Sequence, residues 1–198
     1  MRTSFPPSAF LASALLFFGA QGFAQTQPGE KVPSEPEKDR PKLVVLKPGE
    51  PAEQAHDGGA VRFLVSSEDA KGAWSLVQVT EKPGYKTNVH RHNRTDEAFY
   101  ILEGVLTVRI NEATSEYPAG SYVLIPRGTP HAQGNLGTVP VKFLLTMTPA
   151  GFEQSFRDRI ELMKTVKPDD PDFQKRRKEN AAKGNYDVEF LLDWSPQK

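Results

Sequence analysis

Three of the four histidines in this 198-residue chain fall at two places in the sequence. His90 and His92 are separated by one residue, and His131 follows the turn-forming sequence Pro-Arg-Gly-Thr-Pro. Because side chains alternate across a strand, His90 and His92 point the same way from one extended backbone. Glu97 opens the next apolar run, and a hairpin would return its carboxylate toward the two imidazoles. These residue types predict a divalent transition-metal site made of His90, His92, Glu97 and His131.

The identity of the metal stays open at this point. Three neutral imidazoles and one carboxylate suit manganese, iron, nickel, cobalt, copper or zinc, and they leave coordination positions open. The alternative is a degenerate protein that keeps the scaffold but has lost the metal. Such loss usually replaces ligands, and all four are present, so we expect one bound ion. His56 lies in the loop-like sequence Ala-His-Asp-Gly-Gly, and we interpret it as a solvated histidine rather than a fifth ligand.

Short β-rich runs separated by turn residues must position these side chains. The 17 prolines and 15 glycines fit a chain with many turns. Evenly spaced short strands favour a sandwich or barrel with sequential antiparallel pairing. The predicted runs are 43–46, 61–65, 74–79, 98–102, 105–110, 122–125 and 141–147.

After Pro149 the pattern becomes helical. Apolar residues at three- and four-residue spacing predict an amphipathic helix, on Phe152, Phe156, Ile160 and Met163. A second, more polar helix is expected over 172–183, and its basic run 175–178 is interpreted as a solvated face. The apolar cluster in 186–194 is expected to pack against the barrel or a second copy.

Two strings of fixed spacing carry a resemblance to a known family. The first reads Gly84, five residues, His90, one, His92, four, Glu97, six, Gly104. The second reads Gly120, five residues, Pro126, one, Gly128, two, His131, three, Asn135. Both match signature motifs of the cupin superfamily, and the chain resembles a single-domain cupin over roughly 43–150. The resemblance implies an all-β fold, the double-stranded β-helix or jelly-roll cupin barrel, here followed by a C-terminal helical extension. It also implies that the metal lies near one open end and that Asn135 steadies a loop.

Further strings look like the quercetin-dioxygenase-like cupins, in 61–69, 96–104, 149–153 and 185–191. That resemblance implies ring-opening dioxygenation of a flavonol-type enol at the metal, with Glu97 as both ligand and base. Two other classes stay open. One is a different metal-cupin enzyme, such as a decarboxylase or isomerase, and the other is a non-catalytic cupin that binds a small molecule.

Strand alternation predicts the wall of a pocket for a small-molecule substrate. The expected lining is aliphatic and aromatic, which suits a flat organic substrate more than a phosphorylated sugar. Core packing is the alternative for the same side chains, because small barrels fill their interiors. The predicted pocket residues are Phe99, Ile101, Val108, Ile125, Phe143 and Leu145.

The beginning of the chain reads as an export signal. Residues 1–24 combine a basic start, an apolar run and small residues at the positions that a signal peptidase reads, which predicts cleavage before Gln25. The apolar run is too short to span a bilayer, so no stable membrane span is expected after cleavage and the protein is expected to be secreted or periplasmic. The Pro-rich stretch 25–41 is expected to be a disordered linker, 42–150 the barrel and 151–198 the helical extension.

Composition excludes several classes of function. Lys and Arg together number 25, as do Asp and Glu, so no excess charge indicates binding to nucleic acid or acidic membranes. The absence of cysteine excludes disulfides, thiolate metal sites and cysteine nucleophiles. The resemblance also implies a homodimer, formed through sheet faces or exchanged edge strands such as 43–46.

Overall fold

The computed structural model describes residues 37–184 and 186–195. The predicted signal peptide 1–24 and residues 25–36 of the predicted linker lie outside the described residues. The described part begins with a 3-10 turn at Glu37–Asp39, and the residues that follow run without regular structure up to the barrel.

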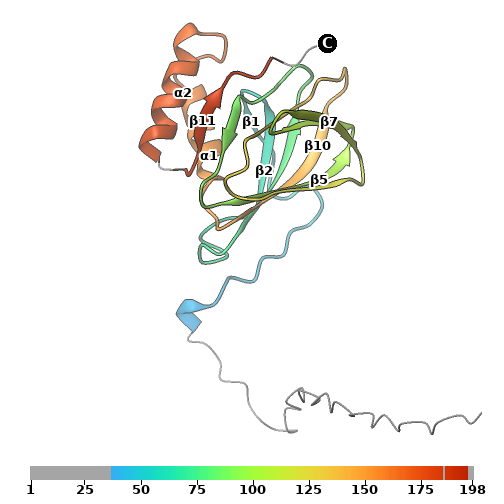
Figure 1. Cartoon of the computed structure of the whole chain (residues 1–198). Helices are drawn as coiled ribbons and strands as arrows, with labels where there is room; N and C mark the ends of the chain where they lie inside the picture. The colour runs from blue at the N-terminus through green and yellow to red at the C-terminus, as the bar shows by residue number, and fades with distance from the viewer. Residues whose placement is uncertain (1–36, 185, 196–198) are drawn as a thin grey trace, which may run out of the picture. The chain divides into compact units, whose positions relative to one another are not determined.

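Two antiparallel sheets form the barrel (Figure 1). One sheet has the strand order β1-β2-β3-β10-β5-β8, and the other has the order β11-β4-β9-β6-β7. In the first sheet the strands are β1 (Gln54–His56), β2 (Gly59–Val65), β3 (Ser75–Glu81), β10 (Val141–Thr148), β5 (Asp96–Glu103) and β8 (Tyr122–Ile125). In the second they are β11 (Glu189–Leu192), β4 (Val89–Arg91), β9 (His131–Gly134), β6 (Val105–Ile110) and β7 (Ala113–Pro118). The mostly-β cupin barrel predicted from the sequence is confirmed.

The core lies between the two sheets and follows from strand alternation. In β3 and β10, buried side chains alternate with partly exposed ones, as period-2 patterning requires. Phe143 of β10 meets Phe99 of β5 edge to face, with ring centroids 5.6 Å apart. Leu106 and Val108 of β6 join the same cluster from the other sheet. Each such buried side chain stabilises the fold by roughly 1.5–3 kcal/mol.

Two helices follow the barrel, α1 (Gln154–Met163) and α2 (Pro171–Gly184), as the sequence predicts. Phe156 of α1 is buried in the barrel core, and Leu162 of α1 packs with Phe173 of α2 in a separate apolar cluster. The helices therefore cover one region of the barrel while also packing on each other. Within the described part of the chain, no helix has the length and apolar character that crossing a membrane requires.

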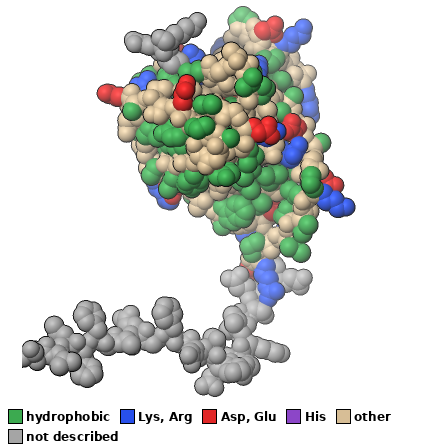
Figure 2. Space-filling model, turned by 90° about the vertical axis from the view of Figure 1, so that its right-hand side faces the viewer, with side chains coloured by type: hydrophobic (Ala, Val, Ile, Leu, Met, Phe, Trp, Pro, Cys, Tyr) green, Lys and Arg blue, Asp and Glu red, His purple; other side chains and the backbone are tan. Residues whose placement is uncertain are grey.

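The C-terminal apolar segment packs on the barrel of its own chain only in part, because Phe190, Leu191 and Leu192 stay 37%, 38% and 51% exposed. Strand β11 pairs with β4, and Trp194 is buried against Val89 and Ala132. By contrast, the strand expected at 43–46 is absent, and Leu43 and Val45 are 92% and 78% exposed. β propensity alone does not make a strand where no neighbouring strand in the described residues offers a ladder. Figure 2 shows further apolar side chains gathered on one face of the molecule, and the large exposed ones in the first sheet include Tyr100, Tyr122 and Leu124.

Candidate metal centre

Four buried side chains, three from strands and one from the residue just after a strand, converge in the barrel. His90 belongs to β4, His92 follows the end of that strand, Glu97 belongs to β5 and His131 opens β9. His90 and His131 are register partners, which places their imidazoles side by side with ring centroids 4.3 Å apart. One potential ligand atom from each of the four residues lies within 4.8 Å of the others. The structure thus brings together the four residues that the spacing pointed to.

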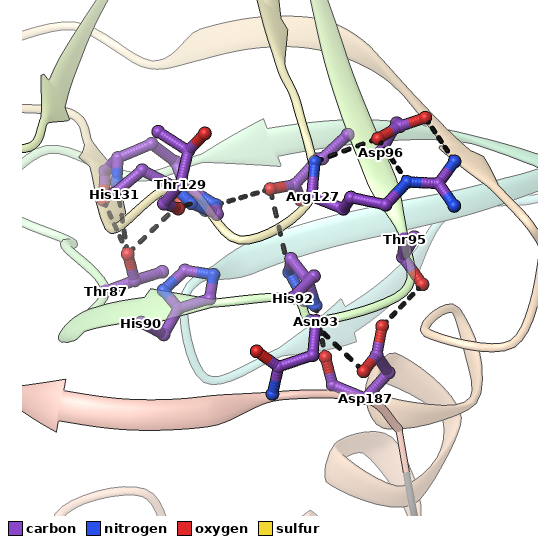
Figure 3. Close-up of polar contacts among 12 residues, drawn as sticks. Thr87, His90, His92, Asn93, Thr95, Asp96, Arg127, Thr129, His131 and Asp187 are labelled. Carbon is purple, nitrogen blue, oxygen red and sulfur yellow. Dashed lines mark hydrogen bonds and ion pairs between the residues drawn. The ribbon is translucent and has the colours of Figure 1, made fainter.

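Each imidazole is oriented by a hydrogen bond on the side away from the cluster. Nδ1 of His90 donates to the carbonyl of Asn88 at 2.9 Å, and Nδ1 of His131 donates to that of Thr129 at 2.9 Å. Nδ1 of His92 donates to the carbonyl of Asp187 at 2.7 Å (Figure 3). These bonds turn the Nε2 atoms toward the cluster, where they can offer lone pairs to a metal ion, as in metal-binding histidines whose other nitrogen is held by a carbonyl.

The donor atoms facing the cluster fit a divalent cation. Nε2 of His92 is buried and has no hydrogen-bond partner among the described residues, which is costly unless something else occupies its lone pair. It lies 3.7 Å from Oε2 of Glu97, while Nε2 of His131 lies 2.7 Å from the same oxygen. One carboxylate and three imidazole nitrogens around a common point match the ligand preferences of first-row divalent ions. This cluster could therefore bind one metal ion.

Electrostatics keep Glu97 charged despite its burial. Burial alone would raise its pKa, but the hydrogen bond with His131 and the three imidazoles together hold that pKa well below its usual range. Burial lowers the pKa of His131, and the Glu97 carboxylate more than offsets this, so the net shift is upward. For His90, burial and the neighbouring His131 lower the pKa to about 3. A cation bound at the cluster would compete with a proton for Nε2 of His131.

A salt bridge anchors the turn that delivers His131. The carboxylate of Asp96 accepts hydrogen bonds from the backbone N–H of Arg127 at 2.8 Å and from its guanidinium at 3.0 and 2.7 Å. The next residue, Gly128, has φ +81° and donates its N–H to the carbonyl of His92 at 2.6 Å. Glycine adopts this left-handed conformation without steric cost. The turn before His131 is therefore tied directly to the strand that carries Glu97 and to His92.

The segment after α2 orients His92 from the other side. Besides its carbonyl, Asp187 offers a carboxylate that accepts from the backbone N–H groups of Asn93 and Arg94 at 3.2 and 2.7 Å, and from the hydroxyl of Thr95 at 3.0 Å. Figure 3 shows Asp187 facing this β4–β5 loop. Glu189 of β11 pairs with Arg91 of β4 through two bonds of 2.8 and 3.1 Å. Nothing in the sequence around Asp187 indicated this role, because the contacts span more than 90 residues.

A cavity of about 70 Å³ opens beside the cluster, with His90 and Glu97 in its wall. Of the predicted pocket residues, Phe143 and Leu145 line it. The other four, Phe99, Ile101, Val108 and Ile125, do not line it and are fully buried in the core. They do face the barrel interior, but that part of the interior is filled by their own packing. The cavity instead extends toward α1, which contributes Phe152, Ser155, Phe156 and Arg159 from its first turns and the residues just before it.

His56 is buried, so its interpretation as a solvated loop histidine is wrong. It ends β1, is 4% exposed and lines the cavity, where its Nδ1 accepts from the backbone N–H of Gly58 at 3.0 Å. Its neighbour Asp57 pairs with Arg159 of α1 and with Arg177 of α2. The basic run 175–178 is consequently not wholly solvated. The two helices cover this end of the barrel, so His56 and Asp57 are buried. The sequence around His56 does not show this, because the helices lie about 100 residues further along the chain.

Comparison with known proteins places these residues in a wider context. A family model described as "Cupin domain" matches residues 77–147. The uncharacterized protein MJ1618 of Methanocaldococcus jannaschii is 35% identical over 94 residues, covering 47% of this chain and 75% of its own length. The tetracenomycin polyketide synthase protein TcmJ of Streptomyces glaucescens is 30% identical over 94 residues, covering 46% of this chain and 62% of its own. The solved structure of KdgF from Halomonas sp. aligns with a TM-score of 0.49 and 17% identity, over 57% of this chain and 99% of that one. All four clustered residues lie inside the matched range 77–147, whereas Arg159 and Asp187 lie outside it.

Proposed function

Since this chain belongs to the cupin superfamily, we propose that it is a metal-dependent enzyme, a dioxygenase acting on a small flavonol-like or other aromatic enol substrate. One observation carries the proposal: the buried cluster of three oriented imidazoles and one carboxylate adjoins a largely apolar cavity. His90, His92, Glu97 and His131 would hold the ion. When bound, a divalent transition metal supplies a Lewis acid that polarises a substrate oxygen and an open position for O2.

Glu97 is the residue that would remove the substrate's hydroxyl proton. Its carboxylate is ionised, buried and in the wall of the cavity. A base must lie within hydrogen-bonding reach of the proton that it abstracts, and a carboxylate beside the metal meets that requirement for an enol bound there. The hydrogen bonds that the three Nδ1–H groups donate to backbone carbonyls keep the imidazoles fixed while this proton moves.

The cavity wall supports an organic substrate with an apolar ring. Val79, Phe143, Leu145, Phe152 and Phe156 contribute apolar side chains to it. Such a wall binds an aromatic face and excludes water from the reacting atoms. A volume of about 70 Å³ favours the smaller members of the class.

The polyketide relative supports the same class of substrate. TcmJ is named as a polyketide synthase protein, and polyketide chains contain enolisable 1,3-dicarbonyl groups. Dioxygenation of an enol places both atoms of O2 in the product, so the reaction needs no additional reductant.

We propose further that the protein works outside the cytoplasm, secreted or periplasmic, and that its partner there is a small molecule. The signal-like composition of residues 1–24 supports export, and the equal numbers of acidic and basic residues give no support to nucleic-acid binding. A homodimer, implied by the resemblance, stays a prediction.

The test is turnover by the metal-loaded protein with and without oxygen. Quercetin, followed by its flavonol absorbance, and a smaller hydroxypyranone are offered in air and under argon. We expect loss of substrate only in air, with one O2 consumed per substrate. Loss of substrate without oxygen uptake would replace the dioxygenase by a decarboxylase or isomerase. No turnover by a fully metal-loaded sample would favour the non-catalytic binding protein.

A further inference from the structure

Buried polar atoms without hydrogen-bond partners gather around the cavity. Among the described residues they include Oε2 of Glu81, Oγ of Ser155 and the hydroxyl of Tyr186, and all three residues line the cavity. They come from β3, from α1 and from the segment before β11. Buried polar groups are normally paired, so several unpaired ones around one cavity indicate that it is shaped for a ligand that bears oxygen atoms.

Glu81 is the most unusual of the three. It is 1% exposed, and its Oε1 lies 3.5 Å from the amide nitrogen of Gln133, which is a weak contact. The carboxyl group has no cation at salt-bridge distance among the described residues. Two arginines line the cavity. Arg159 is already held by Asp57 at 2.6 Å and by the hydroxyl of Tyr85 at 2.8 Å, and Arg177 is held by Asp57 at 3.2 Å. Glu81 therefore enters the cavity without a counter-charge.

The protonation state of Glu81 follows from these surroundings. Burial raises its pKa to about 8, and the Glu97 charge from β5 adds to this effect. The hydrogen bond from Gln133 of β9 and the charge of Arg159 from α1 act in the opposite direction. Tyr85, before β4, is itself neutral because burial raises its pKa. At neutral pH the Glu81 carboxyl thus carries a proton, and a carboxylic acid is a hydrogen-bond donor.

We propose that Glu81 donates a hydrogen bond to an oxygen of the small ligand that binds in this cavity, and that Ser155 and Tyr186 contact further oxygens of the same ligand. The inference rests on the proposed function, because the other end of the ligand binds at the metal centre. It narrows the substrate class to compounds with a metal-chelating enol or phenol group and at least one more oxygen. Glu81 lies outside both sequence motifs and is not one of the four metal ligands.

The test measures ligand binding rather than turnover. The full chain is loaded with Co²⁺ and titrated with kojic acid, a small hydroxypyranone that carries a chelating enol–ketone pair and additional oxygens. Binding is followed by visible absorption and calorimetry. The variants are E81Q, which keeps an N–H donor, and E81M, which has no donor. T80V is the control, because Thr80 lies on the same strand and does not line the cavity.

We expect E81M to raise the Kd about tenfold or more, the loss of roughly one hydrogen bond, while E81Q and T80V stay within about threefold of the wild type. Between pH 6.5 and pH 9, Glu81 ionises and loses its donor, so the wild-type Kd should rise more steeply than that of E81Q. An unchanged Kd in E81M would overturn the inference. If E81M does not fold, equal pH dependence in the wild type and E81Q overturns it instead.

Failure of the proposed function gives a different result. A wild-type chain that takes up no Co²⁺ contradicts the metal centre, and the inference falls with it. A chain that takes up Co²⁺ but does not bind kojic acid keeps the metal centre and overturns the ligand assignment alone.

Discussion

At the scale of single residues, hydrogen bonds from Nδ1 to backbone carbonyls orient the three imidazoles of the candidate site. Asn88, Thr129 and Asp187 each lend a backbone carbonyl, which does not depend on side-chain identity. The sequence can predict His90, His92, Glu97 and His131 because strand alternation and fixed spacing place them. Alternation in β3 places Glu81 on the buried face with Val77 and Val79, but the spacing of the motifs does not show that its carboxyl group lines a cavity.

Glu97 can be tested for its two roles separately. Glu97→Gln keeps a ligand oxygen but has no basic carboxylate, so turnover should fall at least about 100-fold while metal content falls less. Metal content by mass spectrometry and initial rates on the same samples provide the comparison. Glu103→Gln is the matched control, because Glu103 lies on the same strand and is exposed at the surface. Equal losses of metal and of turnover would make Glu97 a ligand only.

Glu81 also predicts how stability changes with pH. Its pKa is about 8 in the folded chain against 4.5 for an ordinary glutamate, so the folded state holds the extra proton between these values. Its contribution to stability is complete below pH 4.5 and is lost as the pH rises to about 8. Relative to the wild type, Glu81→Gln should therefore be more stable at pH 9 than at pH 5. The difference in unfolding free energy between the two pH values should be on the order of a few kcal/mol, and it should appear as a higher Tm of the variant at pH 9.

Thermal unfolding of the metal-free proteins checks this expectation, since bound metal would add its own pH dependence. Thr80→Val should show no such difference between the two pH values. Parallel Tm curves for the wild type and Glu81→Gln would mean that Glu81 ionises normally in the folded protein.

At the scale of elements, the segment after α2 works as a part of the metal centre. Strand β11 pairs with β4, and Asp187 holds both the ring of His92 and the loop that leads to Glu97. The central strands and both helices follow from apolar periodicity. The strand at 43–46 was predicted wrongly and β1 at Gln54–His56 was not predicted, because both depend on which neighbours the chain supplies. The apolar pattern of residues 186–194 predicts that this segment packs against another surface, but it does not predict that the surface is β4.

Removing the Asp187 carboxylate should loosen the metal centre without unfolding the barrel. For Asp187→Ala we expect divalent-ion affinity to fall about 10-fold, because the lost carboxylate holds the loop Asn93–Thr95 beside the backbone carbonyl that orients His92. Competition with a chelating dye measures it. Asp193→Ala, an exposed aspartate in the same segment, is the control. Equal affinities in the two variants would show that β11 only covers the barrel.

At the scale of the whole molecule, the two sequence motifs contain the four metal-binding residues but not all the residues that line the cavity or orient His92. The family match covers 77–147, while Arg159, Ser155 and Asp187 come from the C-terminal extension that closes the cavity. Ligand selection and metal retention are thus expected to depend on residues that a barrel alone does not contain. The sequence motifs therefore predict the fold and the metal-binding residues. They do not predict the cavity wall, because part of that wall comes from the C-terminal extension.

Export is a prediction at the same scale. Expressed with its own leader in a bacterium, the chain should appear outside the cytoplasm with Gln25 as its first residue, because Gly22 and Ala24 are small. Intact-mass measurement of the extracytoplasmic fraction identifies the cleavage point. Ala24→Phe should block processing and leave the longer chain. Full-length wild-type protein in the cytoplasm would contradict the prediction.

The central claim is that His90, His92, Glu97 and His131 hold one metal ion, and X-ray absorption on the metal-loaded chain tests it most directly. Elemental analysis of the same sample gives the stoichiometry, with His131→Ala as the variant that removes one ligand. We predict one divalent ion per wild-type chain, with scattering from three imidazoles, and a smaller imidazole contribution in His131→Ala. A chain that takes up none of the first-row divalent ions, or an ion without imidazole neighbours, would contradict the account.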